Sequence, residues 1–149
     1  MFILTFAVIG LSVFFYISGM KTTLLFLSVF LSLSLFGQSP YFDSGSEHYK
    51  QGEYQEAIDD YNTAIKINPN YALAYYNRGI SYNELGRYQE AINDYNAAIK
   101  INPNDASAYV NRGVTKEQLG IIDNCIDYKK ACELGSTMGC EYYRMDGCN

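Results

Sequence analysis

Apolar and polar residues are distributed very differently before and after residue 38. Residues 1–38 are almost continuously apolar, with Lys21 as their single charged residue and seven of the eight Phe of the chain. Beyond them, charged and amide side chains alternate with short apolar groups, and fourteen of the fifteen Tyr lie there. This contrast indicates an N-terminal targeting or membrane segment followed by a folded region.

The N-terminal segment contains two apolar runs. Residues 20–37, MKTTLLFLSVFLSLSLFG, have the layout of a bacterial secretory signal: Met and Lys, an apolar stretch, then small or polar residues. Residues 2–19 are an apolar run long enough for a membrane-spanning helix. Either this run is a membrane anchor or Met20 is the true start, and cleavage of the signal stays open. The expected location is periplasmic or secreted, or anchored to the membrane by this segment.

The region after residue 38 repeats itself every 34 residues. Residues 54–70 and 88–104 are identical at fifteen of seventeen positions, and AIKINPN recurs unchanged. The same shift aligns two sets of glycines: Gly45, Gly79 and Gly113, then Gly52, Gly86 and Gly120. A period of this length is typical of a recurring helical hairpin. The predicted helices span residues 40–51, 55–67, 73–85, 89–101, 107–119, 122–134 and 138–147.

The aligned glycines predict how each hairpin is built. A glycine inside a helix costs ~1 kcal/mol relative to Ala, so Gly79 indicates a close helix crossing, expected opposite Ala91. Gly86 falls where the first helix turns back, and a left-handed helix end suits Gly. The residue before Pro103 ends the second helix because it avoids helical angles. Asn104 is the expected N-cap of the next helix.

Residues at fixed repeat positions resemble the tetratricopeptide repeat family. In the middle repeat, the small, aromatic and proline positions of that family are filled by Tyr75, Gly79, Tyr82, Ala91, Tyr95, Ala98 and Pro103. The resemblance covers residues 39–139. It implies an all-α fold: a right-handed α-α superhelix, or solenoid, of three helix pairs with a C-terminal capping helix, preceded by the hydrophobic segment.

The repeat spacing also predicts the organisation of the chain. The third repeat is degenerate, because Thr137 stands at the proline position and one residue drops out after residue 120. The expected parts are the hydrophobic segment at 1–38, repeats at 39–71, 72–105 and 106–136, and a capping helix at 137–149.

All four cysteines lie beyond residue 124. Folded as an antiparallel helix pair around residues 135–139, this region would bring them together as two nested disulfides, Cys132–Cys140 and Cys125–Cys148. A zinc site is the alternative, although zinc ligands usually come in closely spaced pairs, and an even count behind a signal favours disulfides. Residues 131–140 also resemble the cysteine-rich, Sel1-like repeats of secreted bacterial proteins, which implies a bridge between successive helices.

Charge narrows the class of partner. The chain carries a formal charge of −5. Because Lys21 is the only charged residue before residue 39, the rest carries −6, which argues against nucleic acid as a ligand. No cofactor is expected. Contact with a membrane is expected only through the N-terminal segment, and a homo-oligomer stays open.

The family resemblance implies a binding groove. In this family the first helix of each pair lines a concave surface that binds a peptide or helix of another protein. Carried over, it gives the groove residues Phe42, Tyr49, Tyr76, Asn77, Ile80, Asn83, Val110, Asn111 and Val114. The alternative is that Tyr76, Ile80, Val110 and Val114 simply pack against one another. One subtype of the family binds the terminal carboxylates of chaperone peptides with a set of Lys, Arg and Asn side chains. This site is disfavoured here because the Lys and Arg residues of that set are missing. The expected function is a non-catalytic protein-binding module.

A weak cell-wall-related hydrolase or penicillin-binding protein is the alternative function. It comes only from the resemblance to cysteine-rich relatives. The single histidine, His48, occupies a position that packs aromatics in other repeats, and it is far from the cysteines in the predicted stack. No nucleophile accompanies it. Asp59 and Asp60 are expected on the solvated outer face.

Overall fold

The computed structural model describes residues 39–145 and 147–148, and within them every regular element is an α-helix. The expected signal or anchor at residues 1–38 lies outside the described residues. The helices are α3 (Pro40–Gln51), α4 (Tyr54–Ile67), α5 (Ala72–Glu84), α6 (Tyr88–Ile101), α7 (Ala106–Gln118), α8 (Asn124–Glu133) and α9 (Thr137–Met145). Of these described helices, none is both long and apolar enough to cross a membrane.

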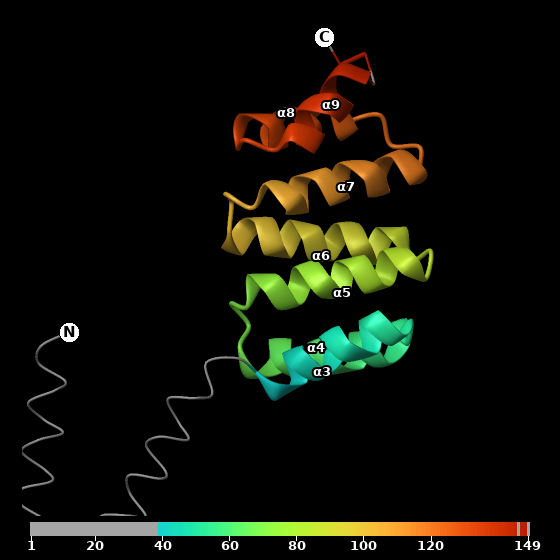
Figure 1. Ribbon diagram of the computed structural model, residues 1–149, viewed down its shortest axis with the longest axis vertical. Coiled ribbons are helices and arrows are strands. Elements are labelled where there is room, and N and C mark those ends of the chain that lie inside the picture. Colours follow the sequence, from blue (N-terminus) through green and yellow to red (C-terminus); the bar gives the residue numbers. More distant parts are fainter. Residues whose placement is uncertain (1–38, 146, 149) are drawn as a thin grey trace, which may run out of the picture. The chain divides into compact units, whose positions relative to one another are not determined.

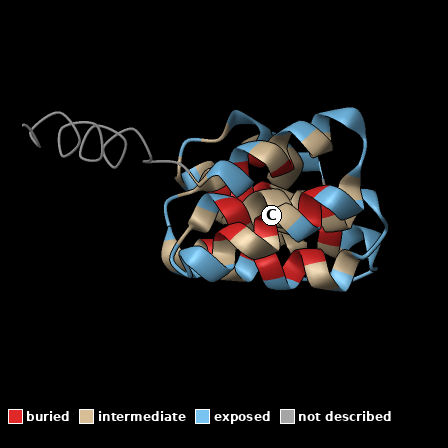
Figure 2. Cartoon of the chain, turned by 90° about the horizontal axis from the view of Figure 1, so that it is seen from below, coloured by how far each residue is buried: buried red, intermediate tan, exposed pale blue. Residues whose placement is uncertain are grey.

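The helices stack in chain order from α3 to α9 (Figure 1). Three antiparallel pairs, α3 with α4, α5 with α6 and α7 with α8, each pack on the next pair, and α9 covers α8. Figure 2 shows buried residues where helices face one another and exposed residues along the outer surfaces and turns. The predicted all-α fold of three helix pairs and a capping helix is therefore confirmed.

Each pair is held by a glycine that meets a buried tyrosine. A Cβ added to Gly79 would lie 2.8 Å from Cε1 of Tyr95. Gly45 with Tyr61 and Gly113 with Tyr128 repeat this contact at 2.8 and 2.6 Å. The expected close crossing is present, but its main partner is the tyrosine ring. Ala91 contributes only its backbone oxygen, 3.3 Å from the added atom, so the prediction of Ala91 as the opposing residue was incomplete.

The first helix of each pair ends just before the glycine expected from the sequence, but one expected N-cap differs. Gly52, Gly86 and Gly120 have φ of 81°, 70° and 72°, the left-handed conformation expected where the first helix ends. The expected N-cap at Asn104 is wrong. Asp105 is the N-cap, because its side chain accepts a hydrogen bond from the Ser107 N–H at 3.0 Å. The Asn104 N–H instead donates to the side chain of Asn102 at 3.3 Å.

The last pair differs from the others in length and in its bonds. Helix α8 begins at Asn124, two residues after the expected start, and Asp123 precedes it with its carboxylate 2.9 Å from Nζ of Lys116. Cys125 is bonded to Cys148 and Cys132 to Cys140, with Cα–Cα distances of 5.5 and 4.5 Å. These are the pairs expected from the sequence. The four sulfurs are therefore bonded to one another, with none left as a thiolate for zinc.

Candidate functional site on the inner face

The first helices of the pairs form one continuous face. Helix α3 contacts α5, α5 contacts α7, and α7 contacts α9, although each of these helices is separated from the next by a full helix in the sequence. We call this surface the inner face. The groove residues predicted from the sequence all lie on α3, α5 and α7, so the structure brings their helices together.

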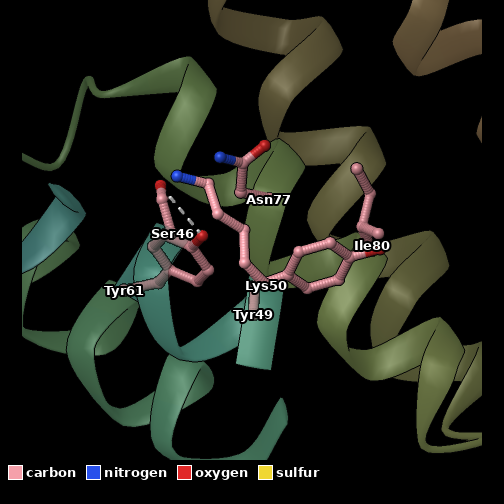
Figure 3. A pocket seen from close by; sticks show the side chains of 6 residues that line it. All are labelled: Ser46, Tyr49, Lys50, Tyr61, Asn77 and Ile80. Atoms are coloured by element: carbon pink, nitrogen blue, oxygen red, sulfur yellow. Dashed lines mark hydrogen bonds between the residues drawn. The ribbon is translucent and has the colours of Figure 1, made fainter. Parts of the chain in front are cut away.

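A cavity opens on the inner face between the first two repeats (Figure 3). Its volume is about 270 Å³. Helices α3 and α5 and the tyrosine of α4 contribute its walls, which are formed by Ser46, Tyr49, Lys50, Tyr61, Asn77 and Ile80. Three of these residues, Tyr49, Asn77 and Ile80, belong to the groove predicted from the sequence.

The cavity combines apolar walls with a polar end. Tyr49 and Ile80 are half-buried and supply the apolar contact surface. At the polar end, the hydroxyl of Tyr61 donates to Oγ of Ser46 at 3.3 Å. Burial raises the pKa of Tyr61, against the opposing effect of its hydrogen bonds with Ser46 and Asn77. The phenol therefore stays neutral and can act as both donor and acceptor.

Lys50 supplies a cation at the rim of this cavity. Its ammonium lies 3.3 Å from a carboxylate oxygen of Glu47, and its side chain is 70% exposed. An exposed pair of this kind contributes little to stability, so the ammonium can exchange partners at low cost. The groove prediction missed Lys50 and Tyr61. Lys50 occupies the same repeat position as Glu84, the residue after the predicted groove residue Asn83, and that correspondence was the available signal.

Two of the predicted groove residues are core residues instead. Phe42 is only 6% exposed, and its ring lies 4.9 Å from that of Tyr71 and 5.7 Å from that of Tyr61, measured between centroids. Val110 is 4% exposed. Since successive first helices touch one another, neighbouring helices cover part of the inner face. The packing alternative is thus correct for Val110, whereas the prediction of Phe42 as a groove residue was wrong, and neither can contact a ligand directly.

Polar groove residues of α5 and α7 hydrogen-bond across the repeat boundary. The amide of Asn111 donates to the hydroxyl of Tyr76 at 2.8 Å, and the hydroxyl of Thr115 donates to the side-chain oxygen of Asn83 at 3.0 Å. Each asparagine keeps further hydrogen-bonding capacity, because an amide has two N–H donors and a carbonyl oxygen. Val114 is half-buried on the same helix. The polar side chains of this part of the face therefore already hydrogen-bond one another.

Ion pairs behind the inner face fix the rotation of the helices that carry it. The guanidinium of Arg78 on α5 bonds Asp94 on α6 and also reaches Asn62 on α4. One repeat later, Arg112 makes the same contacts with Asp127 and Asn96. The guanidinium carbon of Arg78 is 5.9 Å from the ring centroid of Tyr82, so the ion pair with Asp94 is the closer contact.

In the first repeat, His48 makes the contact that corresponds to these ion pairs. Its Nδ1 lies 2.9 Å from a carboxylate oxygen of Asp60, and Nε2 lies 3.8 Å from Glu53. Asp60 occupies the repeat position of Asp94. Ser44 stands at the position of the arginines, and His48, one helical turn later, contacts this carboxylate instead. The expectation that Asp60 is a solvated outer charge was wrong, since its side chain is 21% exposed. All four cysteines form disulfides and supply no thiol near this histidine.

Comparison with solved structures shows that the fold is similar to that of TPR domains. The first TPR of Spaghetti (RPAP3), bound to the HSP90 peptide SRMEEVD, is 27% identical and superposes with a TM-score of 0.68. The match covers 72% of this chain and 87% of that chain. The second TPR domain of human RPAP3, in complex with an HSP70 peptide, is 25% identical and has a TM-score of 0.68. The match covers 72% of this chain and 92% of that domain. MamA is 37% identical and has a TM-score of 0.61, and the match covers 63% of this chain and 56% of the MamA chain.

Sequence comparison agrees with the structural neighbours. No curated protein sequence matches the chain significantly. The family model for the TPR repeat matches residues 45–85 and 81–120, just over half of the chain. The match does not extend over the cysteine-bearing segment, whose Sel1-like character stays a prediction. The repeat scaffold is typical of protein-interaction modules, and the chain belongs to the tetratricopeptide repeat family.

Proposed function

We propose that the inner face between α3 and α5 binds an extended segment or helix of a partner protein, without catalysis. The observation that carries this proposal is the cavity bounded by Tyr49, Asn77 and Ile80, which is concave, mostly apolar and polar at one end. Peptide sites of helical repeats use this combination, with an apolar pocket for one side chain and amides for the backbone. Relatives with the same fold hold peptides of HSP90 and HSP70.

The ligand differs in charge from those chaperone peptides. Arg78 and Arg112 are held by Asp94 and Asp127 and are not available to a ligand carboxylate. Lys50 is the one cation lining the cavity, and Glu47 already lies beside it. The site therefore suits a segment that places an apolar side chain between Tyr49 and Ile80 and at most one acidic group near Lys50, rather than a strongly acidic tail.

The proposed place of action is outside the bacterial cytosol, either exported or held at the membrane by the N-terminal segment. The signal-like residues 20–37 support this location, and so do the two disulfides, because such bonds persist in oxidising compartments. The partner would then be another exported or membrane protein that presents a segment of chain.

A photo-crosslinking amino acid tests the proposal in the native cell. Placed at Ile80, it should capture a partner protein, whereas the same residue at Asn93, exposed on α6, should not. Ile80→Glu should reduce recovery of that partner because it puts a charge into the apolar wall. Circular dichroism should show unchanged helicity, since Ile80 is only half-buried.

Capture that is equally strong from Asn93, or recovery that survives Ile80→Glu, would remove the cavity from the function. Lys50→Glu separates the polar end from the apolar wall. If the ligand carries an acidic group at the rim, the reversal should weaken binding mainly through the association rate, with a strong dependence on salt.

A further inference from the structure

Two exposed isoleucines lie at the start of α8, Ile122 in the turn before the helix and Ile126 in the helix. Ile122 is 92% exposed and Ile126 is 67% exposed. They are four residues apart, and Ile126 lies in the first turn of α8. Single exposed apolar residues are common on protein surfaces, but two large ones this close together form an apolar patch that favours contact with another surface.

The other repeats show that this patch is a local change in an otherwise polar face. Allowing for the dropped residue, Ile122 and Ile126 align with Gln89 and Asn93, which hydrogen-bond to each other at 3.3 Å. The first repeat has Gln55 and Asp59 there, with the same bond at 3.3 Å. A solvated pair of polar side chains has thus been replaced by two isoleucines in the last repeat alone. In the last repeat the helix begins later and Ile122 lies in the turn before it, yet both isoleucines remain exposed, so neither side chain is needed to fill the core.

The charges beside the patch are self-complementary. Asp123 stands three residues before Ile126, and Lys129 stands three residues after it. Both are exposed; Asp123 keeps 56% of its side-chain surface although it pairs with Lys116. If two copies of α8 cross antiparallel at Ile126, each Lys129 faces Asp123 of the other copy.

We propose that two copies of this chain associate through α8, antiparallel and with the two-fold axis at Ile126. The two Ile126 side chains form the buried centre of the contact, and each Ile122 lies at its edge, opposite residue 130 of the other copy. The two pairs of Lys129 with Asp123 fix its direction and register. This surface is on α8, whereas the ligand cavity lies between α3 and α5, so the inference stands independently of the proposed peptide binding. Two inner faces on one dimer would also allow bivalent binding of a partner.

The experiment uses full-length chains with two different affinity tags, expressed together, and measures how much of one tag co-purifies with the other. The variant Ile122→Gln with Ile126→Asn restores the residues of the middle repeat, so it should fold normally. Co-purification should fall about tenfold, because the apolar centre of the contact is lost. Ile67→Gln is the matched control, since Ile67 is a similarly exposed isoleucine, 62% exposed, at the end of α4. It should change nothing.

A charge exchange tests the antiparallel register. Lys129→Asp alone sets two carboxylates against each other at each end of the contact, and Asp123→Lys alone sets two ammonium groups together, so each variant should pair poorly with itself. In a mixed dimer of the two variants, each end of the contact again sets a carboxylate against an ammonium group. The two variants should therefore pair with each other better than either pairs with itself. Thermal melting checks that each variant remains folded, because Asp123 also contacts Lys116.

Three results would overturn the proposal. The first is no co-purification of wild-type copies. The second is association that survives the change of both isoleucines, which would belong to another surface such as the N-terminal segment or a shared partner. The third is a mixture of the charge variants that pairs no better than either variant alone.

Discussion

The guanidinium of Arg78 donates two parallel hydrogen bonds to the carboxylate of Asp94, from Nε to Oδ2 at 2.7 Å and from Nη2 to Oδ1 at 2.6 Å. Its third nitrogen donates to Asn62 of the preceding repeat at 2.5 Å. One side chain thus ties three consecutive helices, α4, α5 and α6. Asp94 is 5% exposed, so the pair is largely removed from water. Burial lowers the tendency of Arg78 to stay charged, but its bonds with Asp94 outweigh this and raise its pKa.

Arg78→Ala should destabilise the protein by about 3 to 5 kcal/mol, because it leaves a buried carboxylate without its partner. Burial already raises the pKa of Asp94, and without the arginine that pKa rises further. A raised carboxyl pKa in the folded state penalises folding at neutral pH and is relieved as the pH falls below it. The destabilisation caused by Arg78→Ala, measured as the difference in unfolding free energy in urea, should therefore be smaller in mild acid.

Arg87→Ala is the control for this prediction. Arg87 pairs with Glu90 at 2.9 Å, but both side chains are more than 40% exposed. Its removal should cost less than about 1 kcal/mol, as for other surface pairs. Equal losses for Arg78 and Arg87 would mean that the buried pair does not hold the repeats together.

Gly79→Ala should destabilise the stack although alanine favours helices. The new Cβ would lie 2.8 Å from the ring of Tyr95, and the resulting strain of about 1 to 3 kcal/mol should exceed the gain in helix propensity. Tyr95→Leu in the same chain should relieve part of the strain, so the two losses should sum to more than the loss in the double variant. Additive losses in thermal or urea unfolding would show that the glycine is not required for the crossing.

Gly86→Ala isolates the other role of glycine. No heavy atom lies within 4 Å of a Cβ added there, but φ is +70°. The cost of about 1 kcal/mol should come from the left-handed backbone alone. No change at Tyr95 should rescue it.

The spacing of small residues and prolines was sufficient to predict the helices, because it records backbone constraints that act locally. Gly86 at a left-handed turn and Pro103 after a helix are of this kind. The burial of Phe42 and Val110 was not predictable from repeat position, because it depends on which neighbouring helix covers each residue. The pairing of Arg78 with Asp94 joins residues on two helices, and only the packed structure shows that they meet. Asp105 replaced Asn104 as N-cap because the chain after Pro103 takes one more residue to enter the helix.

Removing the longer disulfide should loosen α9 selectively. The bond between Cys125 and Cys148 closes a loop with a sequence separation of 23, for which chain entropy gives about 3 kcal/mol. In Cys125→Ser with Cys148→Ser, amide hydrogen exchange in α9 should accelerate, while exchange in α3 and α5 stays slow. Faster exchange in all helices at once would show that the stack unfolds as one unit.

Cys132→Ser with Cys140→Ser is the matched comparison. Its separation is 8, so the same entropy argument gives a smaller loss of about 2.5 kcal/mol. Gly139 still packs closely on Ala131 in this variant, since its added Cβ would lie 2.6 Å from the Ala131 side chain. The shorter bridge should therefore matter less to the position of α9 than the longer one. The reverse order would argue against the loop-entropy explanation.

High pH should unfold the protein through its tyrosines. Burial is the largest cause of a raised pKa in each of five of them: Tyr49, Tyr61, Tyr71, Tyr76 and Tyr95. In the unfolded chain a tyrosine titrates near about pH 10. Since the folded pKa lies above that value, these groups contribute their full stability below about pH 10 and lose it as the pH rises through the folded values. The free energy of unfolding should accordingly be flat up to about pH 9 and fall steeply above it.

Tyr95 should account for a large share of that slope, because it is 1% exposed and no water can stabilise its phenolate. In Tyr95→Phe one ionisation disappears, and the fall in unfolding free energy should become shallower by up to about 1.4 kcal/mol per pH unit. Ultraviolet titration gives a second measure, since buried phenols should ionise only as the helical signal is lost. If all the tyrosines titrated together while the helices remained intact, Tyr61 and Tyr95 could not be the closed interior of the repeats, and the glycine contacts that depend on them would have to be reassigned.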